Sequence, residues 1–309
     1  MKKQLYTFFI MSVSVLAAGL LFSSCEDEIS PELEKADPIL VIDAWLTDIP
    51  GSQVITITET QPYFDKALPP GVSGATVSVV DNEGNTFLFQ EDAAVKGNYV
   101  WTPIASEVIG TIGRTFNLVV EVGGETFVAS SRMGRVPTID SLTFTFEEKN
   151  SITPDMYLAE FWARDFTGPN DTYRIKAWKN GVLLNKPSEL NLAYDAGFSA
   201  GGNFDGVVFA TPIRQGVNPF EEDDNNELLS PYMPGDSIYV ELHSITLEAF
   251  NFLSEVAIQT NRPGGFSELF ATPLSNVSTN IFNENPNGKP VLGFFNVASV
   301  SALGKKFEE

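Results

Sequence analysis

The chain has one histidine and one cysteine, so imidazole bases and thiol nucleophiles are scarce. His243 is the imidazole that any Ser-His-Asp site would have to use. It ends a predicted strand directly before a predicted helix. We therefore interpret His243 as a partly buried residue at a strand-to-helix junction, and we expect no catalytic residue and no enzyme activity.

Carboxylates are abundant, because Asp and Glu total 40. A pair of them could hydrolyse a glycosidic bond, but no spacing marks one pair among so many. The sharpest cluster is residues 221–227 (EEDDNNE), whose oxygens are of the kind that calcium binds. A solid acidic run is also typical of a solvated loop between strands. Both interpretations stay open, and we assign no metal site and no cofactor.

Three glycines, Gly197, Gly201 and Gly202, flank Phe198 and Phe204. This spacing predicts a flexible loop with aromatic side chains, which could also make contacts with a ligand. The chain has 24 Phe against 8 Tyr and 4 Trp. That excess favours core packing or apolar contacts over the stacking of sugars on rings with a polar edge.

Cys25, the single cysteine, is a candidate for lipidation, because it follows a pattern typical of an N-terminal export signal. Lys2 and Lys3 precede an apolar run from Leu5 to Phe22, and small residues separate that run from Cys25. This order is typical of a secretory signal peptide. Its end resembles a bacterial lipobox, in which the cysteine is acylated with chains such as palmitate and becomes the first mature residue. An uncleaved membrane anchor is the alternative.

Three acids, Glu26, Asp27 and Glu28, follow Cys25 directly. The run is similar to the signal that exports lipoproteins of Bacteroidota-type bacteria to the cell surface. A solvated tether without a signal is the alternative. We expect a protein that is lipid-anchored in the outer membrane and faces the exterior, because several acyl chains give stable anchoring.

Composition excludes several other classes of protein. The net charge is −21, which argues against nucleic acid as a partner, because phosphates are bound by clustered Lys and Arg. Hydrophobic residues make up 43% of the chain, enough to build a core, so a disordered chain is excluded. A single cysteine excludes a disulfide framework within the chain.

The elements that must position these residues are mainly strands. Apolar and polar residues alternate in short segments that are separated by turn residues such as Gly123-Gly124, as in a β-sandwich. Strands are expected at residues 39–45, 54–59, 75–80, 86–89, 97–101, 116–122 and 126–129.

A second β-rich unit opens near Pro137, and Asn180-Gly181 predicts a tight hairpin within it. One segment, residues 246–260, repeats apolar residues at helical spacing and predicts an amphipathic helix packed on the second sheet. Its expected stripe is Leu247, Phe250, Leu253, Ala257 and Ile258. Strands are expected at residues 139–146, 157–162, 173–178, 182–184, 206–209 and 237–242. We divide the chain into a signal peptide (1–24), an acidic tether (25–37), a β-sandwich (38–136) and a β-rich domain (137–309).

An ordered series of short motifs in the mature chain resembles the bacterial lipoprotein family catalogued as domain of unknown function 4249. The motifs are residues 42–48, 72–77, 81–84, 97–99, 137–142, 204–206, 234–237, 250–253 and 292–295. The resemblance implies an immunoglobulin-like first domain. It also implies an outer-membrane lipoprotein encoded beside a TonB-dependent β-barrel receptor, and it supplies no catalytic residues.

These observations predict a non-catalytic surface lipoprotein that is an accessory or capture subunit of a TonB-dependent nutrient importer. The alternative is a free-standing lipoprotein for adhesion or for binding an extracellular ligand. The sequence does not identify the ligand.

Overall fold

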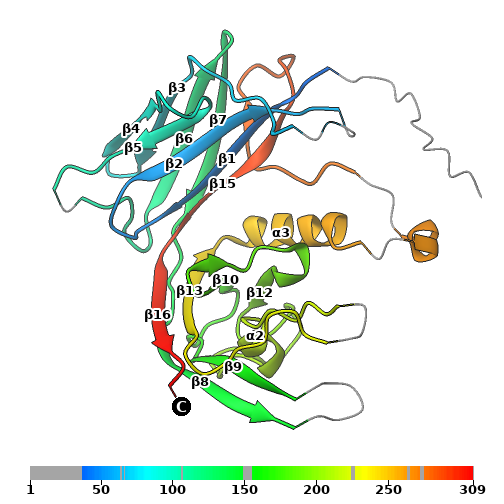
Figure 1. Cartoon of the computed structure of the whole chain (residues 1–309). Helices are drawn as coiled ribbons and strands as arrows, with labels where there is room; N and C mark the ends of the chain where they lie inside the picture. The colour runs from blue at the N-terminus through cyan, green and yellow to red at the C-terminus, as the bar shows by residue number, and fades with distance from the viewer. Residues whose placement is uncertain are drawn as a thin grey trace, which may run out of the picture. The chain divides into compact units, whose positions relative to one another are not determined.

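The computed structural model describes residues 37–62, 65, 67–105, 107–148, 155–223, 227–262, 265–271 and 275–308. The expected signal peptide (1–24) and all but the last residue of the expected tether (25–37) lie outside them. Strands dominate the described part, which confirms the mainly all-β fold (Figure 1). None of the helices described there is long and apolar enough to cross a membrane.

The first strands form a β-sandwich, as expected. Its sheet path is β14-β7-β6-β3-β4-β5-β2-β1-β15, and the path curls until β15 lies beside β7, where the Val297 N–H donates to Ser131 Oγ at 3.0 Å. Alternate residues of the strands point inward to one core. The strands are β1 (Leu40–Thr47), β2 (Gln53–Glu59), β3 (Thr76–Asp81), β4 (Thr86–Glu91), β5 (Asn98–Trp101), β6 (Thr115–Val122), β7 (Glu125–Arg132), β14 (Phe282–Asn283) and β15 (Val291–Ala298).

A buried tyrosine fixes the loop that leads into β3. The Tyr99 hydroxyl donates to the Val72 carbonyl at 2.9 Å and accepts from the Ala75 N–H at 3.0 Å. Gly97 lies directly before β5, the strand that holds Tyr99. Its φ is 86°, and a Cβ there would overlap the Ile57 carbonyl. The sequence motifs at residues 72–77 and 97–99 therefore lie in contact at one corner of the sandwich.

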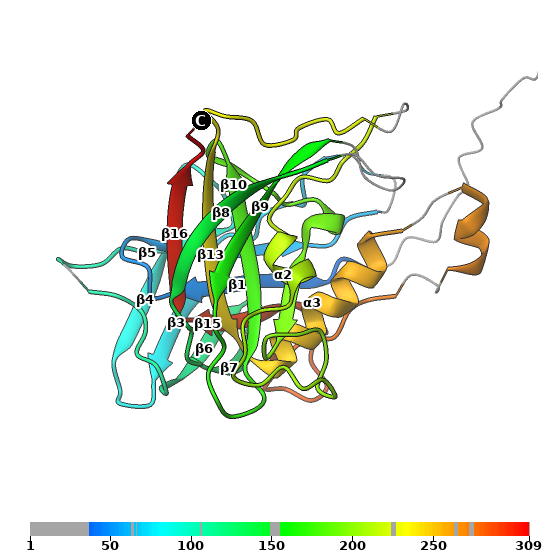
Figure 2. The same cartoon turned by 90° about the horizontal axis from the view of Figure 1, so that it is seen from below.

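The second sheet has the order β11-β10-β13-β16, with β12 also paired to β10. The β8–β9 hairpin lies over this sheet and closes a second core (Figure 2). The strands are β8 (Ile139–Glu147), β9 (Met156–Ala163), β10 (Thr172–Lys179), β11 (Val182–Leu183), β12 (Asn191–Tyr194), β13 (Ser237–Ile245) and β16 (Val300–Lys306). The short helices are η1 (Pro187–Glu189), α2 (Thr211–Gln215) and η2 (Gly265–Phe270).

The predicted amphipathic helix is confirmed as α3 (Leu247–Thr260). Thr246 caps it, because its hydroxyl accepts from the Ala249 N–H at 3.1 Å. The expected apolar stripe is only partly right: Leu253 is buried, but Leu247 and Ile258 are exposed. Ala249 is buried instead. The helix packs against β10, β12 and β15, so its buried face is set by both sheets.

The predicted strand at residues 206–209 is wrong. Val208 makes only an isolated bridge to Arg164, and Gly206 has a φ of 70°. The segment is a turn, and the Phe209 side chain that follows it is buried in the second core. Of its apolar residues, Phe209 is buried and Val207 is exposed.

One continuous stretch of chain serves both sheets. β15 pairs in parallel with β1, and after Ser299 the chain continues as β16 on the edge of β13 (Figure 1). Residues 38–309 accordingly form one compact unit. The boundary expected near residue 136 stays a prediction. The topology adds that residues 282–298 supply strands to the N-terminal sandwich.

Gly293 allows β15 to lie against β1. It pairs with Ile42, has a φ of 99°, and a Cβ there would overlap the Ile42 carbonyl. We expect Gly293→Ala to cost roughly 3 kcal/mol of unfolding free energy, from backbone strain plus overpacking. Urea unfolding measures this cost.

Gly74 offers the matched control. Its φ is 79°, but open space surrounds the position of a Cβ. Gly74→Ala should therefore cost only about 1 kcal/mol from the strained φ alone. Equal losses in the two variants would contradict the close approach of β15 to β1.

Candidate functional site: a slot beside strand β11

The predicted lipidation residue Cys25 and the predicted export residues Glu26, Asp27 and Glu28 lie outside the described residues. The structure therefore leaves these assignments as predictions. The acidic cluster 221–227 is described except for residues 224–226. Within it Glu222 bridges Leu228, and the Asp223 N–H donates to the Glu227 carbonyl at 2.8 Å.

No metal centre is formed by the described residues, because no three His, Cys, Asp or Glu side chains among them could hold an ion together. The glycine-rich loop has a packing role. A Cβ at Gly197 or Gly202 would collide with the ring of Phe204, which packs against the second core. Phe198 is exposed, so a contact role for this loop remains a prediction.

Residues 197–201 (GFSAG) have the G-x-S-x-G spacing of a nucleophile elbow. In the structure they do not form one. β12 ends at Tyr194, turns follow it, and no helix begins behind Ser199. His243 donates to Glu241, and no hydrogen bond joins it to Ser199 among the described residues.

His243 is buried, more completely than expected, at 7% exposure. Its Nε2 lies 2.7 Å from Glu241 Oε2, so a neutral ring donates a hydrogen bond to the carboxylate. Burial lowers the pKa of His243; Glu241 opposes this shift, while the Lys176 and Arg174 charges reinforce it. The imidazole is therefore neutral at neutral pH.

The neighbours of His243 form rungs across β10 and β13. Lys176 stands opposite Glu241, and Arg174 stands opposite His243. The Trp178 and Tyr239 rings make the next rung, with centroids 5.4 Å apart. Burial favours a raised pKa for Glu241, but hydrogen bonds from His243 and Tyr239 and the Lys176 charge bring that pKa below its ordinary value. These paired groups lie on the face of the second sheet opposite the second core.

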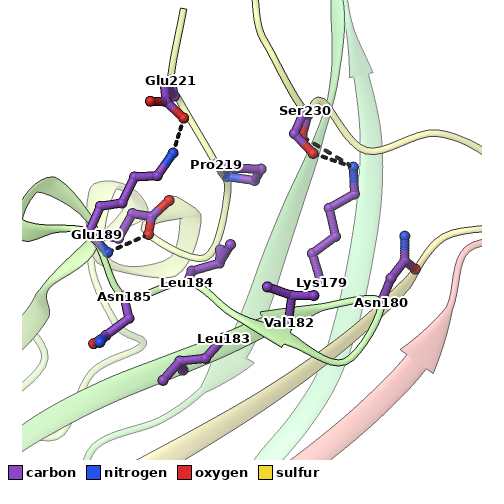
Figure 3. A pocket seen from close by; sticks show the side chains of 11 residues that line it. Lys179, Asn180, Val182, Leu183, Leu184, Asn185, Glu189, Pro219, Glu221 and Ser230 are labelled. Atoms are coloured by element: carbon purple, nitrogen blue, oxygen red, sulfur yellow. Dashed lines mark hydrogen bonds and ion pairs between the residues drawn. The ribbon is translucent and has the colours of Figure 1, made fainter.

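A slot of about 530 Å³ lies at the edge of β10 away from β13 and runs beside β11 (Figure 3). The Asn180-Gly181 turn, with φ of 51° and 79°, folds β11 back onto β10 as predicted. One wall of the slot is the β11 segment, and the opposite wall comes from Pro219, Glu221 and Ser230. The lining residues are Lys179, Asn180, Val182, Leu183, Leu184, Asn185, Lys186, Glu189, Pro219, Glu221 and Ser230.

The charged groups of the slot are already partnered (Figure 3). Lys179 Nζ donates to the Pro231 carbonyl at 2.7 Å and pairs with Asp236 at 3.1 Å. Lys186 pairs with Glu221, and Glu189 accepts from the Lys186 N–H at 2.7 Å. Each of these charged side chains therefore already has a partner among the described residues.

Sequence reasoning missed this slot, apart from Glu221. The short apolar run of residues 182–184 after a hairpin turn could have indicated one wall of the slot. The residues of the opposite wall, Pro219, Glu221 and Ser230, lie more than 30 positions further along the chain. Only the fold brings the two together.

A scan against family models matches residues 26–303 to the domain of unknown function DUF4249. The chain belongs to the DUF4249 family. No curated protein matches this DUF4249 chain. The matched segment covers both the sandwich and the slot, and it begins at the residue after Cys25.

The neutral state of His243 predicts a specific pH dependence. Its pKa in the folded chain is below the unfolded value of about 6.5, so its contribution to stability is present above that pH and is lost as pH falls toward the folded pKa. From pH 8 to 5.5, the wild type should lose about 1 kcal/mol more unfolding free energy than His243→Gln, which retains a donor but does not titrate.

Urea unfolding at both pH values gives this difference. Equal losses in the wild type and in His243→Gln would show that His243 is not held neutral.

Proposed function

We propose that this chain is a lipid-anchored protein of the outer-membrane surface that binds a ligand without converting it. In this proposal it serves as an accessory or capture subunit of a TonB-dependent nutrient importer. The observation that carries the proposal is the order of the chain: a signal-peptide pattern, Cys25, the acids 26–28, and a family segment that starts directly behind Cys25.

The slot supports binding over catalysis. Its lysines and acids hold one another or the backbone, so none of them is an isolated acid or base poised to transfer a proton. A mixed apolar and polar cavity of this size is typical of a ligand site.

The mechanism follows from tethering. Acyl chains on Cys25 would hold the chain at the membrane, because more than one chain gives stable anchoring. A tethered binding module raises the effective concentration of its ligand beside a barrel. Such capture requires no chemical step on the ligand.

The test is purification of the full-length chain with a C-terminal tag from native membranes, after cross-linking in intact cells. We expect a TonB-dependent barrel to be recovered in stoichiometric amount, identified by mass spectrometry. Cys25→Ala is the matched control, and it should lose both membrane association and the barrel, because lipid anchoring supplies the proximity.

Recovery of the chain alone from cross-linked cells would contradict the accessory role and favour the free-standing alternative. Membrane association of Cys25→Ala equal to that of the wild type would contradict lipid anchoring at Cys25.

A further inference from the structure

We propose that the slot beside β11 binds a free oligopeptide in extended conformation, as an additional strand on the edge of the second sheet. This inference rests on the proposed binding function and names its ligand class.

The first argument is the backbone of β11. The Leu184 N–H donates to the Ala177 carbonyl at 2.8 Å, so residue 184 faces β10. Hydrogen-bonding direction alternates along an antiparallel pair, so the N–H and carbonyl of Leu183 point away from β10. Neither these groups nor the N–H of Asn185 has a hydrogen-bond partner within the described part of the chain.

The second argument is the position of the cavity. Four consecutive residues, from Val182 to Asn185, line it. Consecutive strand residues alternate between the two faces of a sheet, so a cavity that touches all four follows the edge of the strand. The cavity thus occupies the space where a further strand would pair, over about 13 Å of backbone.

The third argument is the chemistry of the walls. Val182, Leu184 and Pro219 give the slot aliphatic surface, and none of its described lining residues is aromatic. Sugars are commonly held on Trp or Tyr faces, whereas strand addition uses backbone bonds for affinity and small pockets for alternate side chains. The lining therefore favours a peptide over a carbohydrate.

The ion pair at one end of the slot suits the same ligand. The side chains of Lys186 and Glu221 are 51% and 46% exposed, and a pair so exposed contributes little to stability. It can therefore separate at small cost, so that each group contacts an opposite charge on a peptide.

The experiment compares three proteins, each the full lipidated chain in detergent and immobilised: wild type, Leu183→Ala and Leu183→Pro. The probe is a tryptic digest of casein, and retained peptides are quantified by mass spectrometry. Leu183→Ala retains the outward N–H. Leu183→Pro removes it while the bond from Leu184 to Ala177 remains possible, since proline is tolerated at sheet edges.

We expect wild type and Leu183→Ala to retain a common set of peptides, and Leu183→Pro to retain them about tenfold less, because the proline removes a backbone bond and blocks the edge. Amide hydrogen exchange should show Leu183 and Asn185 protected when the most retained peptide is added. It also reports whether Leu183→Pro keeps the strand protection of β10 and β13.

Two results would overturn the proposal: no peptide retained by wild type above bare resin, or equal retention by a folded Leu183→Pro. If Leu183→Pro does not fold, methylation of alternate backbone nitrogens in the most retained peptide replaces it. Equal binding of all methylated forms would then overturn strand addition. Recovery of a barrel from membranes is independent of these outcomes, so failure here leaves the accessory proposal standing.

Discussion

The chain passes from the sandwich to the second sheet at Ser299, and the fold depends on how that residue is held. Ser299 is buried at 1% exposure. Its hydroxyl donates to the Gly134 carbonyl at 2.8 Å, and its N–H donates to Ser244 Oγ at 3.2 Å. The Ser244 N–H in turn donates to the Ser299 carbonyl at 3.0 Å. Buried polar groups are costly unless paired, so these bonds fix the crossing point.

Asp48, in the loop after β1, holds the residues on either side of Ser299 by hydrogen bonds. Its N–H donates to the Ala298 carbonyl at 3.2 Å, and its carboxylate accepts from the Val300 N–H at 2.9 Å. Residues on both sides of Ser299 are thus tied to the loop after β1. Two consecutive strands, β15 in the sandwich and β16 in the second sheet, therefore join the two sheets within one compact unit.

Local features of this fold were predictable from the sequence, because their causes are local. The Asn180-Gly181 turn and the apolar spacing of the helix expected at residues 246–260 each act within a few residues. β15 was not predicted as a strand, because it is covered on both faces and lacks the alternation that marks a half-exposed strand. Its parallel pairing with β1 joins opposite ends of the chain, and no local pattern encodes it.

In the candidate site, too, features with local causes were predictable and features that depend on long-range contacts were not. His243 was identified from its type, but its role depends on Glu241 and Lys176, which alternation along β13 and cross-strand register bring together. The slot depends on an unpaired strand edge facing a loop, and neither segment is unusual by itself. Cys25 is the reverse case: its predicted chemistry follows from neighbouring residues and needs no tertiary structure.

The central claim is that the crossing from β15 to β16 at Ser299 makes the two sheets a single unit. It is tested most directly by hydrogen exchange of the full chain at increasing urea concentration, read by mass spectrometry. The account predicts that peptides from β1–β7 and from β10–β13 lose protection together, in one cooperative transition. Loss of protection in β10–β13 at urea concentrations where β1–β7 stay protected would contradict it.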